Sequence, residues 1–292
     1  MITERISLKI AGITIRISGR PAMLAPLRAG RYSDFLSYTE RPDLDMELAE
    51  EPADPKSAVP APETMVFDSG TVWSLYATGS TISILLRNPA RGGLPYRVAV
   101  FDRELAHARI SGIGFPGYEE SMSDYDPLEF PLSEVAMVCL LARGRGVMVH
   151  ACGISDGGRG LLFPGNSTHG KSTMARLWKG KGRILNDDRI ILRPSGDGFR
   201  MYGTPWHGDM SDVSAEGVVL SSVRFLFHGQ GDRARPVKGA RAASMLLQRS
   251  FLPLWDREGM DFTLSLCEEV VRRVPCSRLH FIPDENVVEF LR

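Results

Sequence analysis

The sequence lacks an excess of charge of either sign and lacks any apolar run long enough to cross a bilayer. Its 35 basic and 35 acidic residues cancel, which excludes a global field that would attract nucleic acid or an anionic membrane. The longest clean apolar run, Val135 to Ala142, is far shorter than the roughly 20 residues of a membrane helix. The first residues show no charged and then apolar signal pattern. We therefore expect a cytoplasmic protein with no nucleic-acid and no membrane partner.

Cysteine is also scarce, and internal repeats are absent. The four cysteines have no metal-ligand spacing, and they are Cys139, Cys152, Cys267 and Cys276. We expect free thiols, as in a reducing compartment. The hydrophobic content of 43% is typical of a globular chain with an ample core.

One stretch of the chain has the pattern G-x-x-x-x-G-K-[ST] of a phosphate-binding loop. The residues that would bind the nucleotide are Gly165, Asn166, Ser167, Thr168, His169, Gly170, Lys171, Ser172 and Thr173. A short apolar run before the loop, 160–164, predicts a strand, and helical spacing after it, 172–178, predicts a helix. Backbone N–H groups and the helix N-terminus suit phosphate, and the lysine reaches the β- and γ-phosphates. We expect a bound nucleoside triphosphate; the alternative is an ordinary glycine-rich turn between a strand and a helix.

Two residues of this loop have further predicted roles. The Ser172 hydroxyl is expected to ligand Mg²⁺. His169 either adds a donor to phosphate or is a solvent-exposed loop residue, and the second interpretation is favoured.

The chain before the loop predicts a separate domain. Residues 1–125 contain short runs in which apolar and polar residues alternate, which predicts an antiparallel β-rich domain with one wet face. These runs are 6–10, 13–17, 44–48, 72–77, 81–86, 96–101 and 106–110. The proline-rich stretch 51–63 predicts an exposed loop.

Residues 126–292 predict a mixed α/β domain, so the expected fold class is α+β. Strands 147–154 and 160–164 are separated by a tight turn, which predicts a hairpin leading into the phosphate loop. An antiparallel strand pair before this kind of loop is unusual, because the strand before it commonly lies in a parallel sheet. Further expected helices are 132–143, 240–248 and 262–273, and further expected strands are 183–186, 190–193, 199–202, 223–227, 278–282 and 287–291.

A pair of adjacent acids follows the loop after one helix and one short strand. It lies in the sequence Asn186-Asp187-Asp188-Arg189. Phosphoryl transfer uses a carboxylate that organises Mg²⁺ and often a second that orients or deprotonates the attacking hydroxyl. A surface turn is the alternative, but the position between two apolar runs beside a phosphate loop favours a site.

These motifs together resemble a known family. The strand with Val149-His150-Ala151, the hairpin, the loop and the acidic pair are similar to the catalytic domain of HPr serine kinase/phosphorylase, which shares its nucleotide site with phosphoenolpyruvate carboxykinase. The phrase from Tyr202 to Asp209 looks like that of HPr-kinase-like proteins of peptide-maturation cassettes, nearest the ScmC-like group. The resemblance covers about half of the chain, from Val147 onward.

The resemblance implies roles for single residues. Asp187 corresponds to the general base toward a serine hydroxyl, Asp188 to support for Mg²⁺ and Lys171, and Asp209 to a further metal-linked acid. His150 matches a histidine near the active site, although a core histidine is an equal alternative. Trp206 and His207 either form an aromatic wall of the acceptor site or serve packing.

The function expected from this resemblance is an ATP- and Mg²⁺-dependent kinase that phosphorylates a hydroxyl, as on a serine of a peptide or carrier protein. One alternative is a kinase for a free small molecule such as an amino acid. The other is a non-catalytic nucleotide-binding partner in a peptide-modification system, which the unmatched arginine-glycine signature of the family supports. The resemblance also allows a homo-oligomer, without fixing its size.

Overall fold

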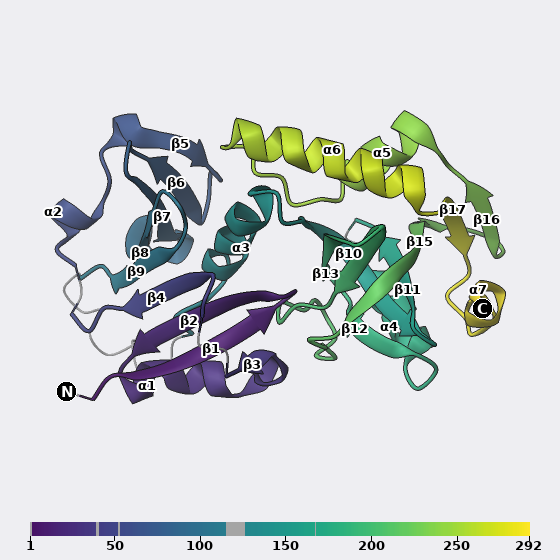
Figure 1. The fold of residues 1–292 in the computed structure, drawn as a ribbon, viewed down its shortest axis with the longest axis horizontal. Helices are drawn as coiled ribbons and strands as arrows, with labels where there is room; N and C mark the ends of the chain where they lie inside the picture. The colour runs from purple at the N-terminus through teal and green to yellow at the C-terminus, as the bar shows by residue number, and fades with distance from the viewer. Residues whose placement is uncertain (1, 39–40, 52, 115–125, 167) are drawn as a thin grey trace. The chain divides into compact units, whose positions relative to one another are not determined.

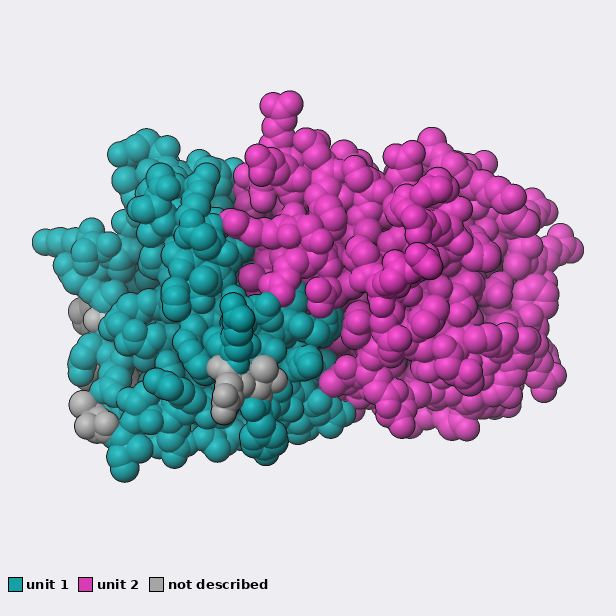
Figure 2. All heavy atoms as spheres, viewed as in Figure 1, with its two compact units in different colours: residues 1–137 teal, residues 138–292 magenta. Residues whose placement is uncertain are grey.

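The computed structural model describes residues 2–38, 41–51, 53–114, 126–166 and 168–292 (Figure 1). It divides into two compact units, Met1–Met137 and Val138–Arg292, which Figure 2 shows in different colours. One sheet of nine strands lies in the first unit and one of eight strands in the second, and both sheets are mixed. The chain is thus of a mixed α/β class. The predicted boundary between residues 125 and 126 stays a prediction, because 115–125 lie outside the described ranges.

The first sheet is built from the alternating runs of the sequence. Ala11 and Gly12, both with positive φ, close its first hairpin. In spatial order its strands are β3 (Leu36–Ser37), β1 (Glu4–Ile10), β2 (Ile13–Gly19), β4 (Leu44–Leu48), β9 (His107–Gly112), β8 (Leu94–Asp102), β7 (Thr81–Asn88), β6 (Trp73–Ala77) and β5 (Met65–Asp68).

The prediction of a purely antiparallel first sheet is wrong. Strand β4 pairs in parallel with both β2 and β9. The reason is the connection from β2 to β4, which crosses over through α1 (Pro21–Leu24), η1 (Ala25–Arg28) and η2 (Gly30–Phe35). These turns bury Leu24, Leu27, Tyr32 and Phe35, so the crossover contributes a large part of the apolar core.

The proline-rich stretch is mostly exposed or half-buried and carries two short helical turns, α2 (Pro55–Ala58) and η3 (Pro62–Thr64). A further turn, η4 (Pro89–Arg91), joins β7 to β8. Helix α3 (Leu132–Ala142) matches its predicted position.

The second sheet carries the phosphate loop. In spatial order its main path is β11 (Arg159–Pro164), β10 (Val147–Asp156), β13 (Arg189–Ser195), β14 (Gly198–Tyr202), β15 (Gly217–His228), β17 (Cys276–Phe281) and β16 (Arg233–Pro236). Strand β12 (Arg183–Asn186) pairs with β10. Because β15 also pairs in parallel with β11, the strands from β11 to β15 close into a ring.

Helices cover this sheet on two sides. Helices α5 (Gly239–Leu247) and α6 (Arg257–Arg273) pack on one core, through residues such as Ala242, Leu246 and Val270. Helices α4 (Lys171–Trp178) and α7 (Asn286–Leu291) pack on a second core with β11 and β17. The four cysteines are buried free thiols, as predicted.

The predicted closing strand at 287–291 is wrong, because these residues form α7. Val287, Val288 and Leu291 are buried together, which is the i, i+1, i+4 spacing of one helix face and not the alternation of a half-buried strand. The Asp284 carboxylate accepts the N–H of Asn286 at 2.9 Å and supports the helix start. No helix within the described ranges combines the length and the apolar character that crossing a bilayer requires.

Candidate functional site

The phosphate loop lies between a strand and a helix, as predicted. Strand β11 ends at Pro164 beside Ala151 of β10, in an antiparallel hairpin, and α4 begins at Lys171. The N–H of Gly165 donates to the His150 carbonyl at 3.3 Å. Gly170 has φ +91, and a Cβ there would lie 2.8 Å from the Phe281 ring, so only glycine fits. Ser167, a predicted nucleotide ligand, lies outside the described residues.

The acidic pair is fixed by the asparagine that precedes it. Asn186 is fully buried, and its Oδ1 accepts the N–H groups of Asp188 and Arg189, each at 2.7 Å. Its Nδ2 donates to the carbonyls of Thr204 at 2.9 Å and Trp206 at 3.0 Å. The turn between β12 and β13 is therefore held rigidly, and the two acids have separate surroundings.

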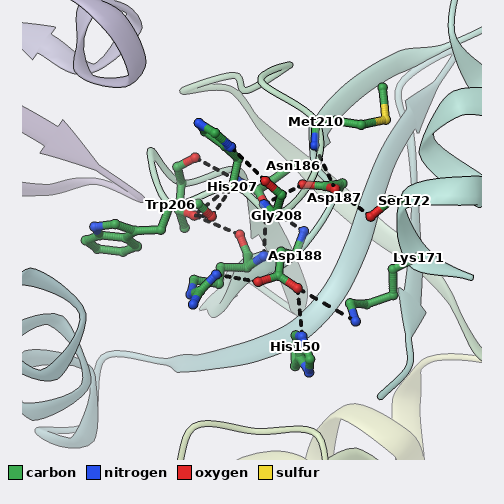
Figure 3. A network of polar contacts seen from close by, with 12 residues as sticks. His150, Lys171, Ser172, Asn186, Asp187, Asp188, Trp206, His207, Gly208 and Met210 are labelled. Carbon is green, nitrogen blue, oxygen red and sulfur yellow. Dashed lines mark hydrogen bonds and ion pairs between the residues drawn. The ribbon is translucent and has the colours of Figure 1, made fainter. Parts of the chain in front are cut away.

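Asp187 is fully buried and contacts the phosphate loop (Figure 3). The Ser172 hydroxyl donates to its Oδ2 at 2.8 Å, and the N–H groups of Gly208 and Met210 donate to its two oxygens at 2.8 and 3.2 Å. A Cβ on Gly208 would lie 3.1 Å from Asp187 Oδ2 and from Asp188 Cβ, so the backbone there approaches the acids closely. The carboxylate of Asp187 thus accepts three donors and has no open surface.

Asp188 lies among three nitrogen-bearing side chains (Figure 3). Nε2 of His150 is 2.7 Å and Nζ of Lys171 is 3.7 Å from its Oδ1, and Arg189 pairs with its Oδ2. Burial raises the pKa of this carboxyl, but the hydrogen bond with His150 and the charges of Arg189 and Lys171 hold the pKa below its usual range. Asp188 is therefore a stable anion beside the loop.

Lys171 is almost fully buried, with a side chain that is 6% exposed. Burial lowers the pKa of its ammonium, and Asp188 opposes that shift. Its Nζ also donates to the Asn166 carbonyl at 3.2 Å. This contact links the two ends of the loop.

The other described residues predicted to bind the nucleotide differ in their burial and backbone conformation. Thr168 has φ +76, an uncommon backbone conformation for a non-glycine residue, and its carbonyl lies 2.9 Å from His228 Nε2. His169 is half-buried and its Nδ1 is buried, against the expectation of an exposed loop residue. Thr173 is half-buried in the first turn of α4.

Two of the remaining predictions concern residues around Gly208. The structure does not bring Asp209 to the acids: its side chain is 76% exposed and 4.0 Å from Arg176. Trp206 is 2% exposed, which favours the alternative that it serves packing. The His207 ring forms a hydrogen bond with the neighbouring Gly208 carbonyl at 3.0 Å.

The residues present fit a magnesium ion held with phosphate. Within the described ranges, no group of three or more His, Cys, Asp or Glu side chains has the arrangement of a metal site. Mg²⁺ with a nucleotide needs only one or two protein ligands, because phosphate oxygens and waters complete its shell. The hydroxyl of Ser172 is the group that would hold such an ion, and the carboxylate of Asp187, 2.8 Å away, would orient that hydroxyl.

The sequence reasoning missed three contributors to this region. Gly208 lies in the phrase from Tyr202 to Asp209, but that resemblance gave no role to its N–H group or to that of Met210, which follows the phrase. Arg249, which follows α5, lies beside His150 and carried no signal beyond being a charged residue after an amphipathic helix. A groove of about 930 Å³ between α5 and α6 contains none of the predicted site residues.

Comparisons with known proteins add little to this geometry. No family model matches the sequence, and no curated protein matches it, so the ScmC-like grouping has no sequence-family support. Among solved structures, the chain is similar to the Hpr(Ser) kinase/phosphatase from Coxiella burnetii, with a TM-score of 0.27 and 12% identity over 50% of this chain and 90% of that one. A similarity of this size carries no conclusion about activity, which must come from the contacts of the phosphate loop.

Proposed function

We propose that this chain binds a nucleoside triphosphate with Mg²⁺ and transfers the γ-phosphoryl group to a hydroxyl, such as a serine of a peptide or carrier protein. One observation carries the proposal. Two consecutive residues of the loop, Lys171 and Ser172, each contact one of two consecutive acids, Asp188 and Asp187. A loop that only binds phosphate has no need of both acids, whereas phosphoryl transfer uses one with the metal and one near the attacking group.

The geometry supports a division of roles between the acids that differs from the predicted one. Asp187 has no exposed surface and already accepts the Ser172 hydroxyl, so it suits the metal side. When bound, Mg²⁺ would neutralise charge on the β- and γ-phosphates. The side chains of Asp188 and His150 remain 18% and 27% exposed, so these two are the groups that a hydroxyl can reach.

The proposed base is therefore the pair of His150 and Asp188. Their contact of 2.7 Å has the form of an imidazole oriented by a carboxylate, an arrangement that lets the ring accept a proton. Lys171 holds the transferred phosphoryl group from the loop side. Arg189, paired with the same carboxylate, keeps Asp188 ionised and in place.

The first test measures transfer from γ-labelled ATP with Mg²⁺ to an array of serine peptides and to free serine. Asp188→Asn should lower transfer on the order of 10²–10⁴-fold, the usual size of a general-base contribution, while ADP affinity changes little. Asp187→Asn should instead weaken the dependence of ATP binding on Mg²⁺. A wild-type rate in Asp188→Asn, together with a lost rate and intact Mg²⁺ dependence in Asp187→Asn, would restore Asp187 as the base.

The same assay separates the alternatives. Labelling of free serine but of no peptide would indicate a small-molecule kinase. ATP binding in calorimetry without transfer or hydrolysis over hours would indicate a nucleotide-binding partner protein, and would contradict the kinase proposal.

A further inference from the structure

The sheet has an unusual continuation next to the phosphate loop. Where β11 turns away into the loop, residues 249–251, which follow α5, take its place beside β10. The His150 N–H donates to the Arg249 carbonyl at 2.6 Å, and the Phe251 N–H donates to the Met148 carbonyl at 2.9 Å. The His150 carbonyl accepts the N–H of Gly165, the first loop residue, at 3.3 Å. One residue of β10 thus holds both the start of the loop and Arg249.

Arg249 is a buried cation that no carboxylate compensates. It is 8% exposed, its Nη1 donates to the Met245 carbonyl at 2.9 Å, and its guanidinium lies 5.8 Å from the centre of the Phe225 ring. Its Nε is buried with no partner, and no ion pair to it occurs in the described part of the chain. Burial lowers the pKa of this group. A buried cation without a counter-charge is costly, unless an anion binds beside it.

A second buried nitrogen without a hydrogen-bond partner belongs to the phosphate loop. His169 has a buried Nδ1 with no hydrogen-bond partner, and its ring is 6.1 Å from that of Phe227 on β15. Phe227 and Phe225, the ring beside the Arg249 guanidinium, are two residues apart on one strand, so they share a face. Burial and the charge of Arg249 lower the pKa of His169, and a hydrogen bond with the Leu226 backbone raises it.

We propose that Arg249 and His169 form a second anion-binding half of the phosphate site, which binds the phosphate chain of the nucleotide on the β15 side of the loop. Strand β11 pairs with β10 on one side and β15 on the other. The acids follow β12, on the β10 side, where Asp188 already engages Lys171 and Arg189. A triphosphate needs further positive charge, and the uncompensated guanidinium of Arg249, whose carbonyl accepts the His150 N–H, supplies it. The inference rests on the proposed function in that it takes the loop to bind a polyphosphate.

The competing explanation is that Arg249 only closes the end of α5 through Met245 and stacks on Phe225. The chain offers a matched control for this explanation. Arg224, the neighbour of Phe225 on β15, is half-buried and also has an unpartnered Nε. Burial lowers its pKa as well, and its charged neighbour is Arg159 at the other end of β11.

The experiment is calorimetric titration of the full chain with sodium tripolyphosphate, with ATP and with adenosine. We compare the wild type with Arg249→Gln, Arg249→Lys and Arg224→Gln, and check folding by circular dichroism. Arg249→Gln should weaken tripolyphosphate and ATP binding about 10- to 100-fold, the value of a charge-assisted hydrogen bond. Arg249→Lys should recover part of that loss, and Arg224→Gln should stay near wild type. Adenosine binding should not depend on position 249.

The outcomes separate the two proposals. If the wild type binds tripolyphosphate and Arg249→Gln binds it as tightly as Arg224→Gln does, the role of Arg249 is overturned and the proposed function stands. If the wild type binds neither ATP nor tripolyphosphate, the proposed function fails first and the anion site with it. If Arg249→Gln does not fold, Arg249→Lys decides, because full wild-type affinity in that variant contradicts recognition by the guanidinium fork.

Discussion

In the first unit, Arg31 and Arg97 each face one carboxylate, at 2.6 Å from Asp126 and 3.0 Å from Glu129. In the second unit, one carboxylate, Asp188, faces His150, Lys171 and Arg189 together. Arg249, which follows α5 in the same unit, has no carboxylate partner among the residues that the structure describes. The first cluster is balanced within the protein, as a group that only stabilises a fold should be. The second contains Lys171, Arg189 and Arg249 against Asp187 and Asp188, an excess of one cation that an anionic ligand would balance. This difference is the reason to place the proposed site in the second unit.

The largest effect expected on ATP binding comes from removing the buried lysine of the second cluster. Lys171→Met should weaken ATP binding by about a hundred-fold, because a buried ammonium directed at phosphate makes charge-assisted hydrogen bonds. The matched control is Lys179→Ala: this lysine follows the same helix, is 64% exposed and pairs with Asp212 at 3.1 Å. Calorimetry with ATP and Mg²⁺ measures both variants. Equal affinities in the two would remove the distinction between the clusters.

A smaller effect, on the rate of transfer, is expected from adding a side chain at Gly208, where the backbone approaches the two acids. In Gly208→Ala, the new Cβ would lie 3.1 Å from Asp187 Oδ2 and from Asp188 Cβ, so one of them must shift by a few tenths of an ångström. We expect transfer to fall by about ten-fold, since small displacements of catalytic groups are costly. Gly198→Ala is the control, because its Cβ would meet no atom within 4 Å. A rate in Gly208→Ala equal to that of the control would mean that the acids tolerate displacement.

The smallest effect is expected in the balanced cluster. Tyr32 is 2% exposed, and its hydroxyl contacts Asp126 at 3.1 Å; burial raises the pKa of this phenol. Tyr32→Phe should lower the free energy of unfolding by about 1 kcal/mol, the net value of one hydrogen bond, and leave ATP affinity unchanged. Urea denaturation beside the fully exposed control Tyr38→Phe measures it. A change in ATP affinity in Tyr32→Phe would show that the first cluster also serves the nucleotide site.

Much of the site was predictable because its parts are local in sequence. The glycine pattern, the apolar run before it and the tight turn before that run predict β10, β11 and α4, and the structure confirms these two strands and this helix. The acidic pair was singled out by its position between two apolar runs. The sequence does not show which acid contacts which loop residue. That depends on the turn between β12 and β13, which Asn186 holds by donating hydrogen bonds to the carbonyls of Thr204 and Trp206.

The errors have a common physical cause, which is that pairing and packing partners are invisible in a local pattern. The alternation of β4 indicates a strand but not that both of its neighbours are parallel. The run that forms α7 is short and mostly apolar, so the sequence predicts a strand, but its buried positions Val287, Val288 and Leu291 have helical spacing and pack against the second core of the sheet. Arg249 carries no motif, and only the pairing of residues 249–251 with β10 brings it to the loop.

The antiparallel hairpin that leads into the phosphate loop has a consequence for how the protein is made. From His150 to Arg189, one uninterrupted stretch of chain supplies the loop, both acids and the histidine. Contacts between residues close in sequence form fast, because little loop-closure entropy opposes them. We expect this stretch, with the loop, the two acids and His150, to fold early during synthesis. The later segments, with Gly208, Met210 and Arg249, then close around it as they leave the ribosome.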